Sequence, residues 1–196
     1  MMNHPLELIV GLGNPGPKYA NTRHNAGEDF VEALARAYGA SLSTDSKYFG
    51  RTAECLIDSQ KVRLLVPETF MNRSGQAIAA LAGFYKIAPE NILVAYDELD
   101  LDTGVARLKF DGGHGGHNGI RDTIQSLANR RDFYRLRLGI GHPGAAHMVS
   151  NYVLSKPSPD DRLSIDTAIT SAIKVMPLAC KGHWNDAMKQ LHTKRI

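Results

Sequence analysis

The sequence predicts a single α/β domain over residues 1–196, and three observations lead to that prediction. Short apolar runs alternate along the chain with longer segments in which apolar residues recur at helical spacing. A chain of 196 residues with 43% hydrophobic content is long enough to bury one substantial core. The sequence contains no internal repeat, low-complexity tract or linker. A sheet with helices packed against it is the simplest architecture that covers so many apolar strands.

Six runs of the chain have the pattern of strands. Residues 6–10 are apolar and are followed by a glycine, which is typical of a short buried strand. Residues 52–57 and 61–66 are two further strands joined by the polar turn D-S-Q. The remaining three strands are predicted at 91–97, 104–110 and 133–141.

Five segments have helical periodicity. Between residues 25 and 38, Phe30, Val31, Leu34 and Tyr38 fall on one stripe, and Gly39 follows where helices commonly end. The other helices are predicted at 74–85, 120–128, 160–181 and 185–192. Ser74 is expected to be the N-cap of the helix at 74–85, because the surrounding N-R-S-G-Q lacks the G-x-S-x-G pattern of serine hydrolases.

Composition narrows the setting of the protein. The formal net charge is only +3, so a surface that binds nucleic acid must be local. Cys55 and Cys180 are far apart, which indicates neither a disulfide framework nor a zinc knuckle and favours a reducing cytoplasm. No leader precedes Leu6, and no apolar stretch is expected to approach the ~20 residues that a bilayer requires. We therefore expect a soluble cytoplasmic protein.

The opening motif G-L-G-N-P-G, residues 11–16, has the letter pattern of a dinucleotide-binding loop but not its mechanics. Such a loop passes at once into a helix whose first N–H groups bind the pyrophosphate, and an acidic residue closes a second strand ~20 residues later. Here Pro15 and Pro17 remove two donors, and the helix starts only near Ala26. Glu32, at the right distance, lies inside that helix. The motif is better explained as a stiff turn that presents Asn14.

Polar residues follow several of the predicted strands. Asp97 ends one strand, Asn72 comes shortly after another, and His24 precedes the first helix. His117 and Asn118 lie in the glycine-rich loop after the strand at 104–110. Sites in open α/β sheets gather beyond the carboxyl ends of strands, so these residues and Asn14 are expected to converge on one edge. Their composition is that of an acid/base site, although each alone also fits a helix cap, an ion pair or a turn.

Other chemistries have weaker signals. His114 and His117 have the spacing of paired metal ligands but lie in a loop without a third ligand motif, so a metal site is not expected. Cys55 lies in the middle of a strand, where burial makes a thiol inert. A histidine acting on water is therefore favoured over a nucleophilic side chain.

Alternation in two strands places cations together. Arg107 and Lys109 share one face of the strand at 104–110, and Arg135 and Arg137 share one face of the strand at 133–141. If the strands belong to one sheet, the four cations form a phosphate-binding edge. A solvated outer face gives the same alternation, and the pattern does not distinguish the two interpretations.

Five motifs together resemble those of the bacterial peptidyl-tRNA hydrolase family, in order and in spacing, between residues 6 and about 154. They are I-V-G-L-G-N-P-G-P-K-Y-A-N-T-R-H-N-A-G, F-M-N-R-S-G-Q, Y-D-E-L-D-L-D-T-G, G-G-H-G-G-H-N-G-I-R-D and R-L-R-L-G-I-G-H-P-G. The resemblance implies a monomer with a twisted mixed, largely parallel sheet flanked by helices. It implies an enzyme that cleaves the ester between a stranded peptide and the terminal ribose of its tRNA. It implies no metal, cofactor, membrane or obligate protein partner.

Site roles follow from the resemblance position by position. His24 resembles the general base, and Asp97 the carboxylate that orients it and favours its proton-accepting form. Asn14 resembles the residue that helps to distinguish N-blocked peptidyl substrates from free aminoacyl ones. The implied contacts with the peptide, the water and the tRNA end are Tyr19, Phe70, Met71, Asn72, His117 and Asn118, and the implied phosphate-binding cations are Lys109, Arg137 and Arg107.

The sequence departs from the family pattern at a few positions. Asp102 and Thr103 stand where prolines are usual, Asp111 where glycine is usual, and Phe70 where tyrosine is frequent. Asp111 is close enough in sequence to Lys109 to weaken its attraction for phosphate. Two other functions remain to be weighed: a catalytically inactive RNA-binding protein on the same fold, and a nucleotide-dependent oxidoreductase that uses the opening glycines.

Overall fold

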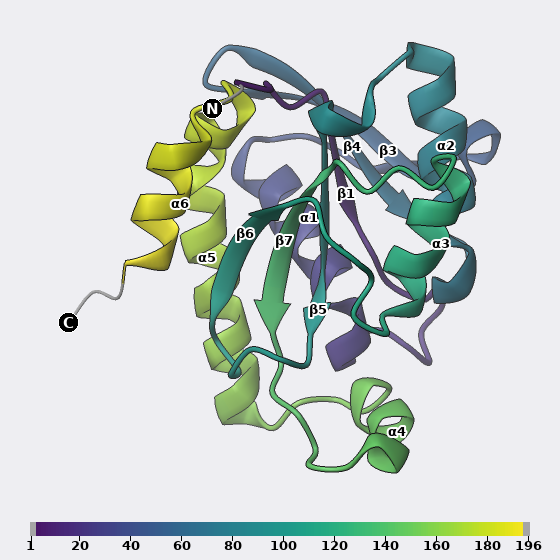
Figure 1. Ribbon diagram of the computed structural model, residues 1–196, viewed down its shortest axis with the longest axis vertical. Coiled ribbons are helices and arrows are strands. Elements are labelled where there is room, and N and C mark those ends of the chain that lie inside the picture. Colours follow the sequence, from purple (N-terminus) through teal and green to yellow (C-terminus); the bar gives the residue numbers. More distant parts are fainter. Residues whose placement is uncertain (1–2, 194–196) are drawn as a thin grey trace.

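A seven-stranded sheet forms the centre of the computed structural model, which describes residues 3–193 (Figure 1). Its strand order is β2-β3-β4-β1-β5-β7-β6. β2, β4, β1, β5 and β7 run in one direction, and β3 and β6 run in the other, so the predicted mixed, largely parallel sheet is confirmed. The strands are β1 (Leu8–Gly11), β2 (Ser43–Asp45), β3 (Gly50–Ile57), β4 (Gln60–Pro67), β5 (Ile92–Glu98), β6 (Ala106–Phe110) and β7 (Tyr134–Gly139).

β1 occupies the middle of the sheet and is paired on both sides. Ile9 lies opposite Leu64 of β4 and Leu93 of β5 in parallel register. Every residue of β1 is buried. A strand covered on both faces needs apolar side chains in both directions, which explains why L-I-V-G is a continuous apolar run without alternation.

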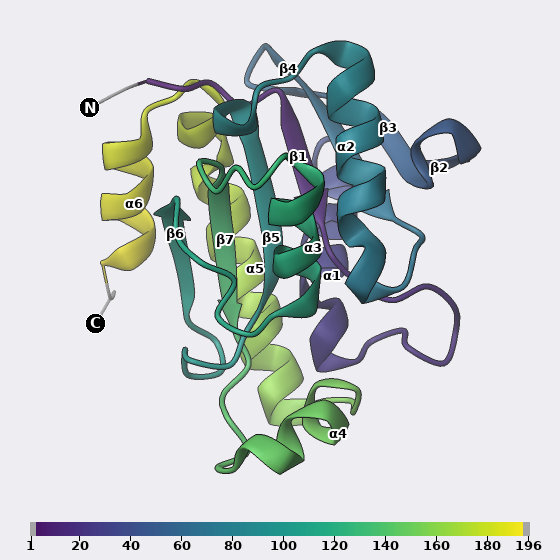
Figure 2. The ribbon, with the colours of Figure 1, turned by 45° about the vertical axis from the view of Figure 1, so that its right-hand side comes forward.

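Helices cover both faces of the sheet. α1 (Ala26–Ala37), α5 (Pro159–Cys180) and α6 (Trp184–His192) share a buried cluster with one face, and α2 (Ser74–Tyr85) and α3 (Asn118–Ser126) lie on the other. Figures 1 and 2 show α5 and α6 on one side and α2 and α3 on the opposite side. The short helix α4 (Val149–Val153) lies beyond the carboxyl ends of β5 and β7 (Figure 1).

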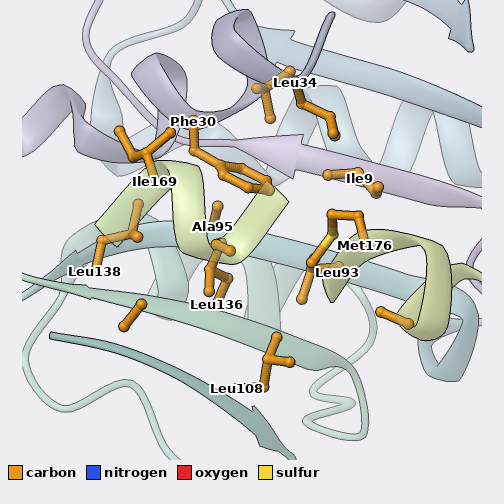
Figure 3. Close-up of a cluster of buried hydrophobic side chains, with 14 of the residues drawn as sticks. Ile9, Phe30, Leu34, Leu93, Ala95, Leu108, Leu136, Leu138, Ile169 and Met176 are labelled. Carbon is orange, nitrogen blue, oxygen red and sulfur yellow. The ribbon is translucent and has the colours of Figure 1, made fainter. Parts of the chain in front are cut away.

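The larger core lies between α1, α5 and the sheet. In Figure 3, Phe30 of α1 and Ile169 of α5 lie over Ala95 of β5, with Leu136 of β7 beside it. All four are buried. Burying a side chain such as Phe or Ile is worth about 1.5–3 kcal/mol, so this layer fixes α1 firmly on the sheet.

α1 approaches the sheet so closely that two glycines are required. A Cβ on Gly27 would lie 2.1 Å from the carbonyl oxygen of Ala95, and one on Gly11 would lie 2.2 Å from the carbonyl oxygen of Gly27. Both contacts are with backbone, which has little freedom to move. The first turn of α1 therefore rests directly on the carboxyl ends of β1 and β5, where the polar residues of the sequence motifs are found.

α5 corrects an expectation about membrane-spanning segments. By length and composition it is apolar enough to cross a bilayer, so the expectation that no stretch of the chain comes near this requirement was wrong. Eight of its residues are buried, among them Ile165, Ile169 and Met176 in the main core. The helix is therefore apolar because much of it faces the sheet and α1.

All predicted strands and helices are present, with ends shifted by a few residues. β2 and α4 were not predicted, and they are only three and five residues long. The prediction for Ser74 was wrong, because this residue is the first of α2 and not its cap. A 3-10 turn at Met71–Arg73 precedes the helix, so the Ser74 hydroxyl meets a carbonyl and donates to the Met71 oxygen at 2.7 Å.

Replacing Gly27 with alanine should destabilise the fold. The added methyl meets the Ala95 carbonyl, and overpacking of this kind costs about 1–3 kcal/mol or more in the free energy of unfolding. The matched control is Gly83→Ala in α2, where nothing lies within 4 Å of the new Cβ and a gain of about 0.5–1 kcal/mol is expected. Chemical denaturation of both variants measures the difference. Equal stabilities would show that α1 does not depend on this close approach.

Candidate active site

A cavity of about 480 Å³ opens beyond the carboxyl ends of β1, β4 and β5. One part of its wall is polar and comes from the sequence motifs, and another is apolar and comes from the segment around α4. It is lined by Asn14, His24, Phe70, Met71, Asn72, Asp97, Glu98, Leu99, Gly115, Gly116, His117, Asn118, Ala146, Val149, Ser150, Val153 and Leu154. Eight of the predicted site residues therefore line one cavity. They are Asn14, His24, Phe70, Met71, Asn72, Asp97, His117 and Asn118.

His24 and Asp97 are in direct contact. Asp97 is the penultimate residue of β5 and is 3% exposed, and His24 lies in the 3-10 turn Arg23–Asn25 that leads into α1. The imidazole Nδ1 lies 2.9 Å from Asp97 Oδ2 and 3.1 Å from Oδ1. An ionised carboxylate only accepts hydrogen bonds, so the proton of neutral His24 is assigned to Nδ1. Its Nε2 then carries the free lone pair.

His117 binds the other side of the same carboxylate. Its Nε2 lies 2.8 Å from Asp97 Oδ1. Its Nδ1 accepts from the backbone N–H groups of Gly119 and Ile120, at 3.1 and 3.3 Å, and so caps α3. Because Nδ1 is an acceptor, the proton of the ring lies on Nε2, and His117 donates to Asp97.

These contacts shift two pKa values in opposite directions. Burial raises the pKa of Asp97, but the two imidazoles lower it by more, and the carboxyl remains ionised well below its usual range. Burial lowers the pKa of His24, but the charge and hydrogen bond of Asp97 raise it by more, so the net shift is upward. His24 is therefore a stronger base than a free imidazole.

The same three side chains meet the distance requirement for a metal site, since their donor atoms all lie within 4.8 Å of one another. The chemistry of the donor set does not fit a metal. A neutral imidazole binds a metal through an unprotonated nitrogen, and the other nitrogen then carries the proton. Nδ1 of His117 faces two backbone N–H donors and has no room for a proton. The arrangement fits a carboxylate that holds two N–H groups.

Asn14 is fixed in one orientation. The side chain of Asn25 accepts from the Asn14 backbone N–H at 2.8 Å and donates to its carbonyl at 3.0 Å. The Asn14 side-chain oxygen accepts from the backbone N–H of Met71 at 2.7 Å. Among residues 3–193, no hydrogen bond engages Asn14 Nδ2. The amide of Asn14 therefore offers the cavity a donor and not an acceptor.

Other predicted contacts lie on the rim. Asn72 and Asn118 are exposed residues at the cavity wall, and Phe70 is exposed beside buried Met71. Tyr19 does not line the cavity itself but packs edge-on against Phe70, with ring centroids 6.3 Å apart. The rim thus combines two amides with an aromatic pair.

The glycine-rich loop reaches the site by a route that the sequence did not predict. β6 is antiparallel to β7, so it ends at the opposite edge of the sheet, and the loop must return before His117 meets Asp97. Gly112, Gly115 and Gly116 all have positive φ on this return. Buried Arg135 donates to the carbonyls of Gly112 and Gly113 and holds the loop in place.

The four predicted cations do share one face at the sheet edge, but they differ in exposure. Arg107 is paired with Arg137, and Lys109 with Arg135, across β6 and β7. Arg135 is 1% exposed and is committed to the loop carbonyls, so it is not free to bind a ligand. Lys109 is exposed, and Arg137 lies 3.6 Å from Glu98 at the cavity.

Two features of the site were not predicted. One is the apolar part of the cavity wall, and the other is the set of residues that fix the polar side chains in position. Arg23 donates to the Tyr152 carbonyl at 3.1 Å and lies over the Tyr152 ring, which ties the His24 turn to α4. Asn25 supports Asn14. Arg23 and Asn25 flank His24 in the T-R-H-N motif, but their partners are 129 and 11 residues away, and no local pattern reveals such pairs.

The family profile and the relatives that this chain matches all carry the same description. The sequence profile of the family described as peptidyl-tRNA hydrolase matches residues 8–196. The peptidyl-tRNA hydrolase of Pseudomonas fluorescens (strain SBW25) is 58% identical over 190 residues, which cover 97% of this chain and 98% of the relative. That of Teredinibacter turnerae (strain T7901) is 57% identical over 192 residues and is covered completely.

Solved structures agree. The crystal structure of peptidyl-tRNA hydrolase from Acinetobacter baumannii has a TM-score of 0.95 and 48% identity, with 100% of this chain and 98% of that chain covered. A purine nucleoside phosphorylase from Toxoplasma gondii has a TM-score of 0.52 at 11% identity over 93% of each chain. The second likeness concerns the fold alone.

Removing the Asp97 charge should lower the pKa of His24. In the intact protein we expect a pKa above the ordinary value of about 6.5, because Asp97 stabilises the imidazolium. In Asp97→Asn the burial remains and the attraction is lost, so the pKa should fall below that value. NMR titration of the imidazole ring measures both. Glu98→Gln, the adjacent carboxylate without a contact to His24, is the control; an equal fall there would contradict a specific Asp97 effect.

Proposed function

The chain belongs to the peptidyl-tRNA hydrolase family, and on that basis we propose that His24 is the base that activates water for its reaction. The protein hydrolyses peptidyl-tRNA: water cleaves the ester between the peptide and the ribose at the 3′ end of the tRNA, which recycles tRNA from prematurely released peptidyl-tRNA. The observation that carries the base assignment is the contact between His24 Nδ1 and the buried Asp97 carboxylate, which leaves Nε2 free.

The reaction then proceeds in two proton transfers. A water molecule attacks the ester carbonyl and gives a proton to His24 Nε2, while Asp97 stabilises the imidazolium that forms. The tetrahedral intermediate breaks its bond to the ribose oxygen, and the imidazolium returns the proton to that oxygen. The products are a peptide with a free carboxyl group and a tRNA with a free hydroxyl group. No side chain becomes covalently attached to the substrate.

Amide donors on the cavity wall serve the oxyanion and the water. We assign Asn72 and Asn118 to this work because both are exposed at the wall that also includes His24. An N–H donor placed where negative charge develops stabilises the transition state more than the ground state. His117 has a different part: it contacts Asp97 and the N-terminus of α3, so it positions Asp97 and Asn118.

Asn14 selects substrates with a blocked amino group. Because its Oδ1 accepts from Met71, its Nδ2 is the group of this side chain that can donate to a ligand in the cavity. A peptide carbonyl of the substrate is a suitable acceptor. A free aminoacyl ester presents an ammonium group instead, which is also a donor and carries a positive charge. Two donors repel, so the site favours peptidyl-tRNA over aminoacyl-tRNA.

Cations on β6 and β7 bind the tRNA backbone near its acceptor stem. Lys109 and Arg137 are the principal phosphate ligands in this proposal, and Arg107 assists them. Arg135 is not included because it is buried. Asp111, which was expected to compete for Lys109, forms no ion pair within residues 3–193, and its oxygen accepts from the Gly112 N–H at 2.6 Å. Asp111 therefore makes no direct pair with Lys109, although its charge remains in the same loop beside Lys109.

The alternatives have no support in the described residues. An inactive RNA-binding protein would not need the base, its carboxylate and the amide donors around one cavity, and here they are together. The oxidoreductase hypothesis fails because the family match covers the opening glycines. We further propose that the chain is one domain that acts as a monomer in the cytoplasm, without a cofactor or an obligate protein partner.

Replacing His24 with alanine should lower kcat by about 10²- to 10⁴-fold, the usual contribution of a positioned base. The fold should survive, since His24 lies in a turn at the cavity and buried Asp97 keeps its hydrogen bond from His117. The assay is release of peptide from N-acetyl-aminoacyl-tRNA, with the exposed His183→Ala as a matched control. Undiminished turnover in His24→Ala would remove His24 from the role of base.

Replacing Lys109 or Arg137 with alanine should make tRNA binding less dependent on salt. Each phosphate contact releases counterions, so each variant should reduce the slope of log K against log salt by about one. Binding of deacylated tRNA at several salt concentrations measures this slope. Lys174→Ala, on the exposed face of α5, is the control. Slopes equal to that of the control would place the phosphate site elsewhere.

A further inference from the structure

The loop that carries Asn14 is supported from below by an acidic residue of α1. We propose that Glu28 is a positioning residue for substrate selection, because it holds the Asn25 amide that in turn holds Asn14. This inference rests on the role proposed for Asn14. It concerns a residue that does not line the cavity and whose side chain binds Asn25 and Arg51 and not His24.

Asn25 uses its entire side-chain amide within this network. It is 1% exposed, and its oxygen and one N–H bind the backbone of Asn14. Its other N–H donates to Glu28 Oε2 at 2.8 Å. Without Glu28, a buried amide N–H would have no acceptor, which is unfavourable where it remains buried. Asn25 would have to turn toward another partner, and the Asn14 backbone would move with it.

The loop also rests on Glu28 directly. The Glu28 backbone N–H donates to the Leu12 carbonyl at 3.0 Å. A Cβ on Gly13 would lie 2.9 Å from Glu28 Oε2 and 2.9 Å from Cγ of Asn25. The backbone of the G-L-G-N turn thus packs against the carboxylate and amide pair, which explains why residue 13 has no side chain. A shift of the Glu28 carboxylate or the Asn25 amide would therefore displace the backbone of Asn14.

Glu32 provides a matched control, because it binds the same arginine as the other oxygen of Glu28. Arg51 of β3 donates to Glu28 Oε1 at 2.8 Å and to Glu32 Oε1 at 2.7 Å. Glu32 therefore shares the arginine but has no contact with Asn25. Burial, followed by repulsion from Glu32, raises the pKa of Glu28 to about 7. Glutamine keeps one oxygen that can accept from Asn25 but replaces the oxygen that accepts from Arg51 with an NH2 group, so Glu28→Gln tests the Asn25 contact separately from the Arg51 contact.

The effect should appear in selectivity and not in the chemistry of the base. Asn14 Oδ1 is held by Met71, and its Nδ2 is aimed by the position of the loop. A shift of the loop misplaces this donor relative to the substrate carbonyl. The His24 and Asp97 pair is joined through a different strand, β5, and its protonation should be unchanged.

The experiment compares kcat/KM for N-acetyl-aminoacyl-tRNA and for the unblocked aminoacyl-tRNA in five variants. Glu28→Ala, and Glu28→Asp, whose carboxylate is one methylene too short, should reduce the ratio about three- to tenfold, the effect of one lost hydrogen bond. Glu28→Gln and Glu32→Ala should keep the ratio within about twofold of the unmodified protein. The pH at which kcat/KM falls on the acid side should be the same in all of them.

Two results would overturn the inference: an unchanged ratio in both Glu28→Ala and Glu28→Asp, or an equal loss in Glu32→Ala. If Glu28→Ala does not fold, Glu28→Asp against Glu28→Gln decides, because the aspartate keeps the charge next to Arg51. The fifth variant, Asn14→Ala, separates this inference from the proposed function. Selectivity retained there refutes the role of Asn14, whereas selectivity lost there and retained in the Glu28 variants refutes only the role of Glu28.

Discussion

The buried carboxylate of Asp97 holds the site together. It accepts hydrogen bonds from His24 and His117, which come from segments 73 and 20 residues away. One contact fixes the tautomer of His24, and the other joins the carboxylate to the N-terminus of α3. A buried charge is costly unless it is paired and fully hydrogen-bonded. The same requirement that keeps Asp97 stable in the fold therefore holds the proposed base and the glycine-rich loop at one point.

The sheet and α1 provide the frame for that meeting. Gly11 and Gly27 allow the first turn of α1 to rest on the ends of β1 and β5, and the turn before it carries His24 and Asn25. His24 then faces Asp97, while Asn25 faces Asn14. A side chain on either glycine would separate the helix from the strands and both pairs with it. Packing in the core thus sets the position of the proposed base, His24, and of the proposed selectivity residue, Asn14, together.

Much of the fold was predictable because its elements have strong local patterns. The continuous apolar run of β1 and the helical stripe of Phe30, Val31 and Leu34 require burial in one way only. β2 and α4 were missed since three or five residues carry too little periodicity. The sequence motifs also contain the polar residues that line the cavity. Their order after successive strands indicated the shared edge, although the glycine-rich loop reaches it from an antiparallel strand.

Residue type and local spacing were enough to establish the α/β class, the order of the main elements and the set of polar residues with acid/base character. The resemblance to a known family suggested roles for several of those residues, and only the folded arrangement shows which partners each of them contacts. Folding turned Arg135 inward to hold carbonyls, gave His117 two partners, and linked Glu28 to Asn14 through Asn25. Such assignments depend on distances between segments far apart in the chain, and those distances are set by packing.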